Sequence, residues 1–166
     1  MKKLFILFQL AIVPLIFAHA ITLNQLQFNY NDCRYLKYVN KEYHYSFQYP
    51  DFMVSDEGED ESGKGIQLSN GEVAIASWVD EKMGDTPQTL WNVLRENSEI
   101  QYVYHNIKAN VLVTIGKKHN GNIIYDKWIF TKQFILSVSM EYPESMKKEM
   151  EPIVKKIGDS FSCKTL

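Results

Sequence analysis

The chain has 166 residues, with 18 basic and 20 acidic side chains and 45% hydrophobic residues. This length and composition are typical of a globular protein with a buried core and one domain. The balance of charge is mildly acidic, and no basic stripe alternates with aromatic residues, so we do not expect nucleic acid as a partner.

The first 20 residues have the pattern of a secretory signal peptide. Lys2 and Lys3 precede an apolar run over 4–17, and Ala18 and Ala20 supply small residues at a cleavage point. The run is about 14 residues, shorter than the about 20 of a membrane-spanning helix. We therefore expect cleavage after Ala20, a periplasmic or secreted protein, and no membrane span in the mature form.

Cleavage of 20 of the 166 residues leaves 146, with 16 basic and 20 acidic side chains and a formal charge of −4. Residues 21–42 are polar and aromatic without a clean period, and we expect an N-terminal segment there with room for a short helix. Residues 43–166 are expected to form a single α+β domain.

Two cysteines, Cys33 and Cys163, lie near opposite ends of the mature chain. In an oxidising compartment a disulfide between them is the simplest use. Its loop of about 130 residues would stabilise the fold by roughly 4–5 kcal/mol in the chain-entropy model. Two separate buried thiols are the alternative. Cysteines so far apart match no CxxC redox or zinc motif, and we expect no metal or cofactor.

Strict alternation of aromatic and polar residues predicts a strand over 43–49, ended by Pro50. The aromatic residues are Tyr43, Tyr45, Phe47 and Tyr49. Side chains of this size on one face of a strand are expected to pack in the core, and a ligand platform is the alternative.

Two Asn-Gly pairs, Asn70-Gly71 and Asn120-Gly121, predict tight hairpin turns, because both residue types tolerate positive φ angles. The strands expected around them span 65–68, 72–80, 111–115, 123–130 and 134–142. The last three form a meander.

Helices are expected on either side of this meander. Thr86 and Pro87 predict an N-cap and a first helical position, and Leu90, Trp91 and Leu94 fall on one side of a helix over 87–97. A second apolar stripe predicts a C-terminal helix, which Pro152 begins or kinks. Its residues are Met146, Met150, Ile153, Ile157 and Phe161. The fold class is therefore α+β, an antiparallel sheet flanked by helices.

The order of these elements resembles the PsbP-like superfamily, which includes the extrinsic subunit of photosynthetic oxygen evolution and periplasmic proteins of the DcrB type. The resemblance covers about 43–162 and is carried by the strand Tyr45-Ser-Phe-Gln-Tyr49-Pro50, the helix from Thr86, the meander and the closing helix. It implies a sandwich of antiparallel sheet and helices, and roles in binding and assembly. No functional residue transfers with it.

No catalytic constellation is evident. His44, His105 and His119 have neither HExxH nor His-x-His spacing, and polar surface positions are expected for all three. The chain has no GxSxG elbow and no phosphate-binding glycine loop.

A run of acidic residues follows the first strand and predicts an exposed loop. Its members are Asp56, Glu57, Glu59, Asp60 and Glu61. A solvated loop is the simplest interpretation, and docking to a basic partner is the functional one. Calcium binding is a further alternative, but the spacing does not match an EF-hand.

These features favour a non-enzymatic binding or assembly protein that acts on another envelope or secreted protein. A small hydrolase or ligand-modifying enzyme, with a site assembled from scattered residues that include His44 or His105, is one alternative. An immunity or inhibitor protein that neutralises an exported toxin through the acidic loop is another.

Overall fold

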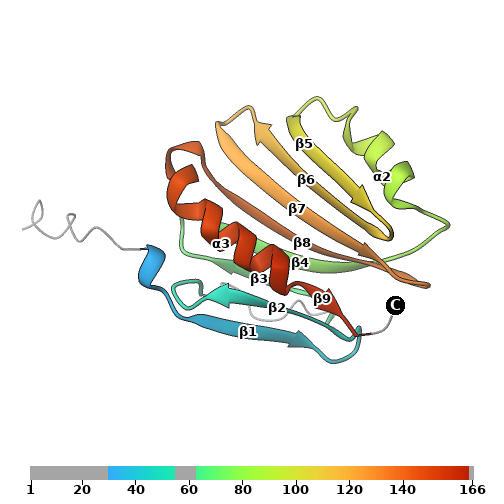
Figure 1. Cartoon of the computed structure of the whole chain (residues 1–166), viewed down its shortest axis with the longest axis horizontal. Helices are drawn as coiled ribbons and strands as arrows, with labels where there is room; N and C mark the ends of the chain where they lie inside the picture. Colours follow the sequence, from blue (N-terminus) through green and yellow to red (C-terminus); the bar gives the residue numbers. More distant parts are fainter. Residues whose placement is uncertain (1–29, 55–62, 165–166) are drawn as a thin grey trace, which may run out of the picture. The chain divides into compact units, whose positions relative to one another are not determined.

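Two antiparallel sheets and two α-helices make up the structure, a computed structural model that describes residues 30–54 and 63–164. The large sheet has six strands in the order β3-β4-β8-β7-β6-β5, and the small sheet has three in the order β1-β2-β9 (Figure 1). The strands are β1 (Tyr35–Asn40), β2 (Tyr45–Pro50), β3 (Ile66–Ser69), β4 (Ala74–Glu81), β5 (Ile100–Lys108), β6 (Val111–Lys118), β7 (Asn122–Phe130), β8 (Phe134–Pro143) and β9 (Ser162–Cys163). The helices are α2 (Pro87–Leu94) and α3 (Lys147–Ser160). The predicted α+β class is confirmed.

The described part of the segment 21–42 holds a short 3-10 helix, η1 (Tyr30–Asp32), followed by a strand that was not predicted. Residues Tyr35–Asn40 form β1, which pairs with β2 so that Tyr38 lies opposite Phe47. Only Tyr38 and Asn40 of this strand are buried, and Leu36 and Val39 are exposed. Because its apolar residues do not alternate with its polar ones, the strand has no readable period of two.

The aromatic face of β2 packs in the core, as predicted, at Tyr45 and Phe47, which are almost fully buried. Both rings contact Phe161, which follows α3. The Tyr45 hydroxyl lies 3.0 Å from Ser77 Oγ on β4 and donates to the Lys64 carbonyl at 2.9 Å. This side chain therefore links the small sheet to the large one.

Both predicted Asn-Gly hairpins are present. Gly71 and Gly121 have φ angles of +89° and +86°, and the strands around each turn pair antiparallel. The meander has one strand more than predicted, because β5 pairs with β6 along its outer edge.

Opposite faces of the large sheet carry the two helices. Helix α2 begins at a capping box between Thr86 and Thr89 and ends at Leu94, three residues earlier than expected. It packs through Leu90, Trp91 and Leu94 on a buried cluster. That cluster consists of Leu112, Trp128, Phe130 and Ile135.

Helix α3 lies on the other face, against β2, β7 and β8. Pro152 is inside the helix and does not begin it. Side chains alternate between the faces of a strand, so Tyr125 faces α3 whereas Trp128 faces α2. In Figure 1, α3 leaves β5 and β6 uncovered on its own face.

Candidate functional site

A groove of about 560 Å³ lies between α3 and the part of the large sheet that this helix leaves open. Its apolar lining comes from four strands and the helix: Val103, Ile115, Ile123, Tyr125, Tyr142 and Val154. Its charged lining consists of Lys117, Glu144, Lys147, Glu151 and Lys155. An apolar recess with a polar rim is the usual form of a binding site.

Strand register builds the floor of the groove. Ile115 on β6 lies directly opposite Tyr125 on β7, and Ile123 lies opposite both Lys117 and Tyr142. Directly opposed residues of antiparallel strands project from the same face. These five neighbouring side chains therefore form one continuous surface beside α3.

The outer side of the groove is formed by an irregularity in β5. Tyr102 pairs with Gly116 and Tyr104 with Ile115, so Val103 is an extra residue in the ladder. Such bulges bend an edge strand and change where its side chains point. Val103 is 67% exposed and Tyr104 is 47% exposed. Two large side chains therefore extend the apolar surface of the groove into solvent.

The inner wall depends on a close approach between β7 and α3. A β-carbon at Gly158 would lie 2.3 Å from the Tyr125 hydroxyl oxygen, so only glycine allows the helix to sit at this distance. Burial raises the pKa of Tyr125 above its ordinary value. The Tyr125 hydroxyl therefore stays protonated, and this wall of the groove carries no charge from it.

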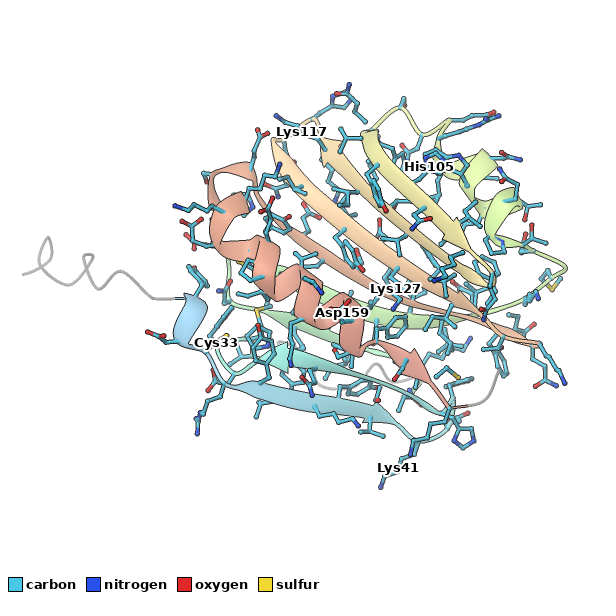
Figure 2. The ribbon with its side chains drawn as sticks, in the orientation of Figure 1. Cys33, Lys41, His105, Lys117, Lys127 and Asp159 are labelled. Atoms are coloured by element: carbon cyan, nitrogen blue, oxygen red, sulfur yellow. The ribbon has the colours of Figure 1, made fainter. Side chains whose placement is uncertain are left out.

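Lys127 holds the end of the same helix. Its Nζ donates to the carbonyl oxygens of Gly158 at 2.7 Å and Phe161 at 3.1 Å. A cation is favoured at a helix C-terminus because the unpaired carbonyls carry partial negative charge. Burial lowers the pKa of Lys127, and the nearby Asp159 carboxylate partly offsets that shift (Figure 2).

Ion pairs surround the rim. Lys117 donates to Glu144, and Lys155 donates to Asp159 one helical turn away. Lys147 and Glu151 lie 3.9 Å apart. All of these groups are at least partly exposed, so each pair contributes little to stability and leaves its charges available to a ligand.

The three histidines lie in separate places. His105 on β5 stacks on Trp91 of α2 at 4.0 Å between ring centroids and 10° between ring planes, on the face opposite the groove. His119, in the turn after β6, lies with Nε2 2.8 Å from the Ser98 carbonyl oxygen. His44 lies in the turn before β2, with a φ of +56°.

His44 and Cys163 nevertheless share a second recess, of about 480 Å³. Its lining includes Glu42, Tyr43 and residues 131–134 of the turn before β8. The amide of Lys164 donates to the His44 carbonyl, which brings the end of β9 to this turn. A thiol and an imidazole are thus in one place, an association that the spacing in the sequence did not suggest.

The predicted disulfide between Cys33 and Cys163 is not formed in the structure. Cys33 precedes β1, whose first residue pairs with Pro50, whereas Cys163 pairs with Tyr45. Figure 2 shows Cys33 at one end of the β1–β2 hairpin and Lys41 in the turn at the other. The length of β2, about 17 Å, separates the two cysteines, whereas a disulfide requires Cα atoms within about 7 Å.

Two of the predicted features lie outside the described residues. They are the signal peptide and the acidic loop, with Asp56, Glu57, Glu59, Asp60 and Glu61. Over 30–54 and 63–164, no group of three or more His, Cys, Asp or Glu side chains is arranged to hold a metal ion. Within the same residues, neither helix is long and apolar enough to cross a membrane.

Sequence reasoning predicted three of the four strands of the groove, all except β5, but not the groove itself. The alternation of Val111, Val113 and Ile115 indicates one buried face, and nothing in it shows that α3 would cover only part of that face. One signal was readable: residues 100–125 contain no acidic residue.

The six-stranded sheet with a small sheet and a helix on one face defines a PsbP-like α+β fold. Solved structures of other proteins share this fold, among them the following two. The cyanobacterial PsbP (CyanoP) of Synechocystis sp. PCC 6803 matches with a TM-score of 0.57 and 8% identity, over 79% of this chain and 93% of that one. The Ran-binding protein Mog1p of Saccharomyces cerevisiae matches with a TM-score of 0.59 and 7% identity, over 81% and 97%. No family model matches the sequence, and no curated protein matches it.

Proposed function

We propose that the protein is an exported, non-enzymatic binding protein that holds another envelope or secreted protein in the groove beside α3. The observation that carries this proposal is the exposure of Val103 and Tyr104 next to an apolar recess of about 560 Å³. Large exposed apolar side chains beside a recess with a charged rim are typical of interaction surfaces.

The shared fold supports a binding role. Mog1p is a Ran-binding protein, and CyanoP is a PsbP protein; both match most of this chain in structure. At identities of 7–8% this likeness concerns the fold, and it is the groove that suggests where this chain would bind.

Export is supported by the sequence of residues 1–20, with its basic start, apolar run and small residues before the cleavage point. A mature protein in the periplasm or outside the cell meets envelope and secreted proteins. Amino-terminal sequencing of the recovered protein tests this part, and the expected first residue is Ile21. A first residue of Met1 in protein recovered from the cytoplasm would contradict it.

The groove is tested by measuring how much partner protein each of two surface variants recovers. Val103→Glu places a charge at the groove, and Val39→Glu places the same charge on β1, where Val39 is 48% exposed. Both positions are exposed, so both variants should fold. Tagged mature protein is incubated with an envelope fraction, and bound proteins are identified. We expect Val103→Glu alone to lose the partner; equal recovery by both variants would rule out the groove.

A second candidate is a thiol-dependent enzyme at the recess that His44 and Cys163 share. A thiolate nucleophile requires a base close to it, and an imidazole is the most common one. Screening the mature protein against ester and amide substrates, beside Cys163→Ser and His44→Ala, tests this candidate. Turnover that both substitutions abolish, with the fold retained, would favour it over the binding proposal.

The acidic loop carries a separate proposal, because a cluster of carboxylates favours a basic partner. Replacing Asp56, Glu57, Glu59, Asp60 and Glu61 by serine should then abolish binding of an exported toxin. Unchanged affinity in the serine variant would remove this possibility without affecting the groove.

A further inference from the structure

We infer that the groove accepts an acidic amphipathic segment of the partner protein, in which a large apolar side chain enters the recess and carboxylates meet the lysines around it. This inference rests on the proposed function and adds the chemistry of the bound segment. The charges around the groove carry it.

The two strands that α3 leaves uncovered, β5 and β6, carry basic side chains and no acidic ones. The chain has 20 acidic residues, and none of them lies between residues 100 and 125. The lysines in this stretch are Lys108, Lys117 and Lys118. The uncovered strands β5 and β6 thus contrast with a mature chain whose formal charge is −4.

Register places most of this charge on the groove side. Lys117 lies opposite Ile123, and Lys108 lies opposite Val111, so both share the face that α3 occupies. Lys118 projects from the other face and pairs with Glu141 at 2.6 Å. Lys108 forms no ion pair with any residue in the described ranges, so its charge is available to a partner.

The helix adds Lys147 and Lys155 along the opposite side of the groove. Glu144 and Glu151 also line it; Glu144, just before the helix, pairs with Lys117 of β6, and Glu151 lies 3.9 Å from Lys147. A segment that lies over the strands meets Lys108 without an ion-pair partner in the described residues, and its carboxylates would compete with Glu144 for Lys117 at small cost, because both members of that pair are exposed.

The distance between the strand lysines sets the size of the segment. Lys108 and Lys117 are separated along the hairpin by six residue steps on β6, about 20 Å. About six extended residues or about 13 helical residues cover this distance. Short segments of this kind bind grooves through a few apolar side chains, and charge complementarity adds specificity.

The same charges disfavour other occupants. A second copy that docked face to face would bring lysines of β5 and β6 against lysines, and like charges across an interface cost affinity. A basic segment is disfavoured for the same reason. An anionic lipid would satisfy both the apolar and the cationic features, and the experiment separates it from a protein segment.

Photo-crosslinking in the source cell tests the inference. Benzoylphenylalanine replaces Val103 at the groove or Val39 on β1 as a matched control, and crosslinked peptides are identified by mass spectrometry. We expect adducts only at position 103, to a segment of another protein with net negative charge and at least one large apolar residue. An adduct to a neutral or basic segment, to lipid, or to a second copy of this chain overturns the inference.

The crosslinked segment is then synthesised and titrated against variants. Lys108→Glu should weaken binding about tenfold, and Lys37→Glu, a matched change on β1, should not. Raising the salt concentration should weaken binding of the wild-type protein, since exposed charges are screened. Equal affinities for the two variants would also overturn the inference. A non-acidic protein segment leaves the proposed function standing, whereas no protein adduct at position 103 contradicts both.

Discussion

The hydroxyl of Tyr125 on β7 lies against Gly158 of α3, where a β-carbon would be 2.3 Å from the hydroxyl oxygen. This contact sets the distance between the helix and the sheet at one wall of the groove, because Tyr125 also lines the groove. Packing that positions the helix therefore positions the candidate site.

Gly158→Ala should destabilise the protein by up to about 2 kcal/mol. Alanine favours a helix by about 1 kcal/mol over glycine, but overpacking of a buried contact costs about 1–3 kcal/mol. Urea denaturation measures the change. Combining Gly158→Ala with Tyr125→Phe removes the oxygen that is closest to the new methyl group, so the double variant should lose less than the sum of the two single effects. Additive effects would show that the contact between the new methyl group and the Tyr125 hydroxyl does not cause the loss of stability.

Lys127→Met should cost about 2–3 kcal/mol in the free energy of unfolding, because hydrogen bonds from a charged donor to the Gly158 and Phe161 carbonyls are lost. The matched control is Lys155→Met, which removes an exposed pair with Asp159 and should change stability by no more than about 0.5 kcal/mol. Equal losses in the two variants would mean that Lys127 does not hold the helix end.

Asp126 should make stability depend on pH. It is 4% exposed, and burial raises its pKa from 3.8 to about 6, although a hydrogen bond from Ser139 opposes the shift. The folded pKa is above the unfolded one, so the neutral form is favoured by folding. This contribution is fully present below about pH 4 and is lost as the pH rises through about 6.

Asp126→Asn should therefore raise stability at pH 7 by about 2–3 kcal/mol and leave it unchanged at pH 4. Denaturant titrations at unit steps between pH 4 and 8 measure both proteins. A difference between them that is the same at every pH would show that Asp126 does not titrate in this range.

Tyr45→Phe should destabilise the protein by about 1–2 kcal/mol, because the Lys64 carbonyl and Ser77 Oγ lose a buried hydrogen-bond partner. Tyr49→Phe, on the same strand, should change stability less, since Tyr49 is only partly buried. Thermal unfolding of the two variants compares them, and a larger loss at position 49 would mean that the Tyr45 bridge does not join the sheets.

Local patterns predicted much of the fold. The Asn-Gly turns, the capped helix at Thr86 and the aromatic strand around Phe47 all depend on backbone preferences or on a period of two, which neighbouring residues determine. Strand β1 was missed, because Leu36 and Val39 are apolar but exposed.

Features that depend on distant residues were not predictable. The disulfide expected between Cys33 and Cys163 failed because the register of β1 and β9 on β2 places the two cysteines at opposite ends of the hairpin. A separation along the sequence contains no information about that register.

The amino-acid sequence was enough to specify the fold class, the hairpins and the acid-free stretch 100–125, because turn chemistry, alternation and charge are properties of neighbouring residues. Only the tertiary structure decided that α3 covers β7 and β8 and leaves β5 and β6 open, with Val103 at the edge of the groove. Which part of a sheet face a helix covers depends on long-range packing, here the contact between Tyr125 and Gly158, and not on the pattern of either element alone.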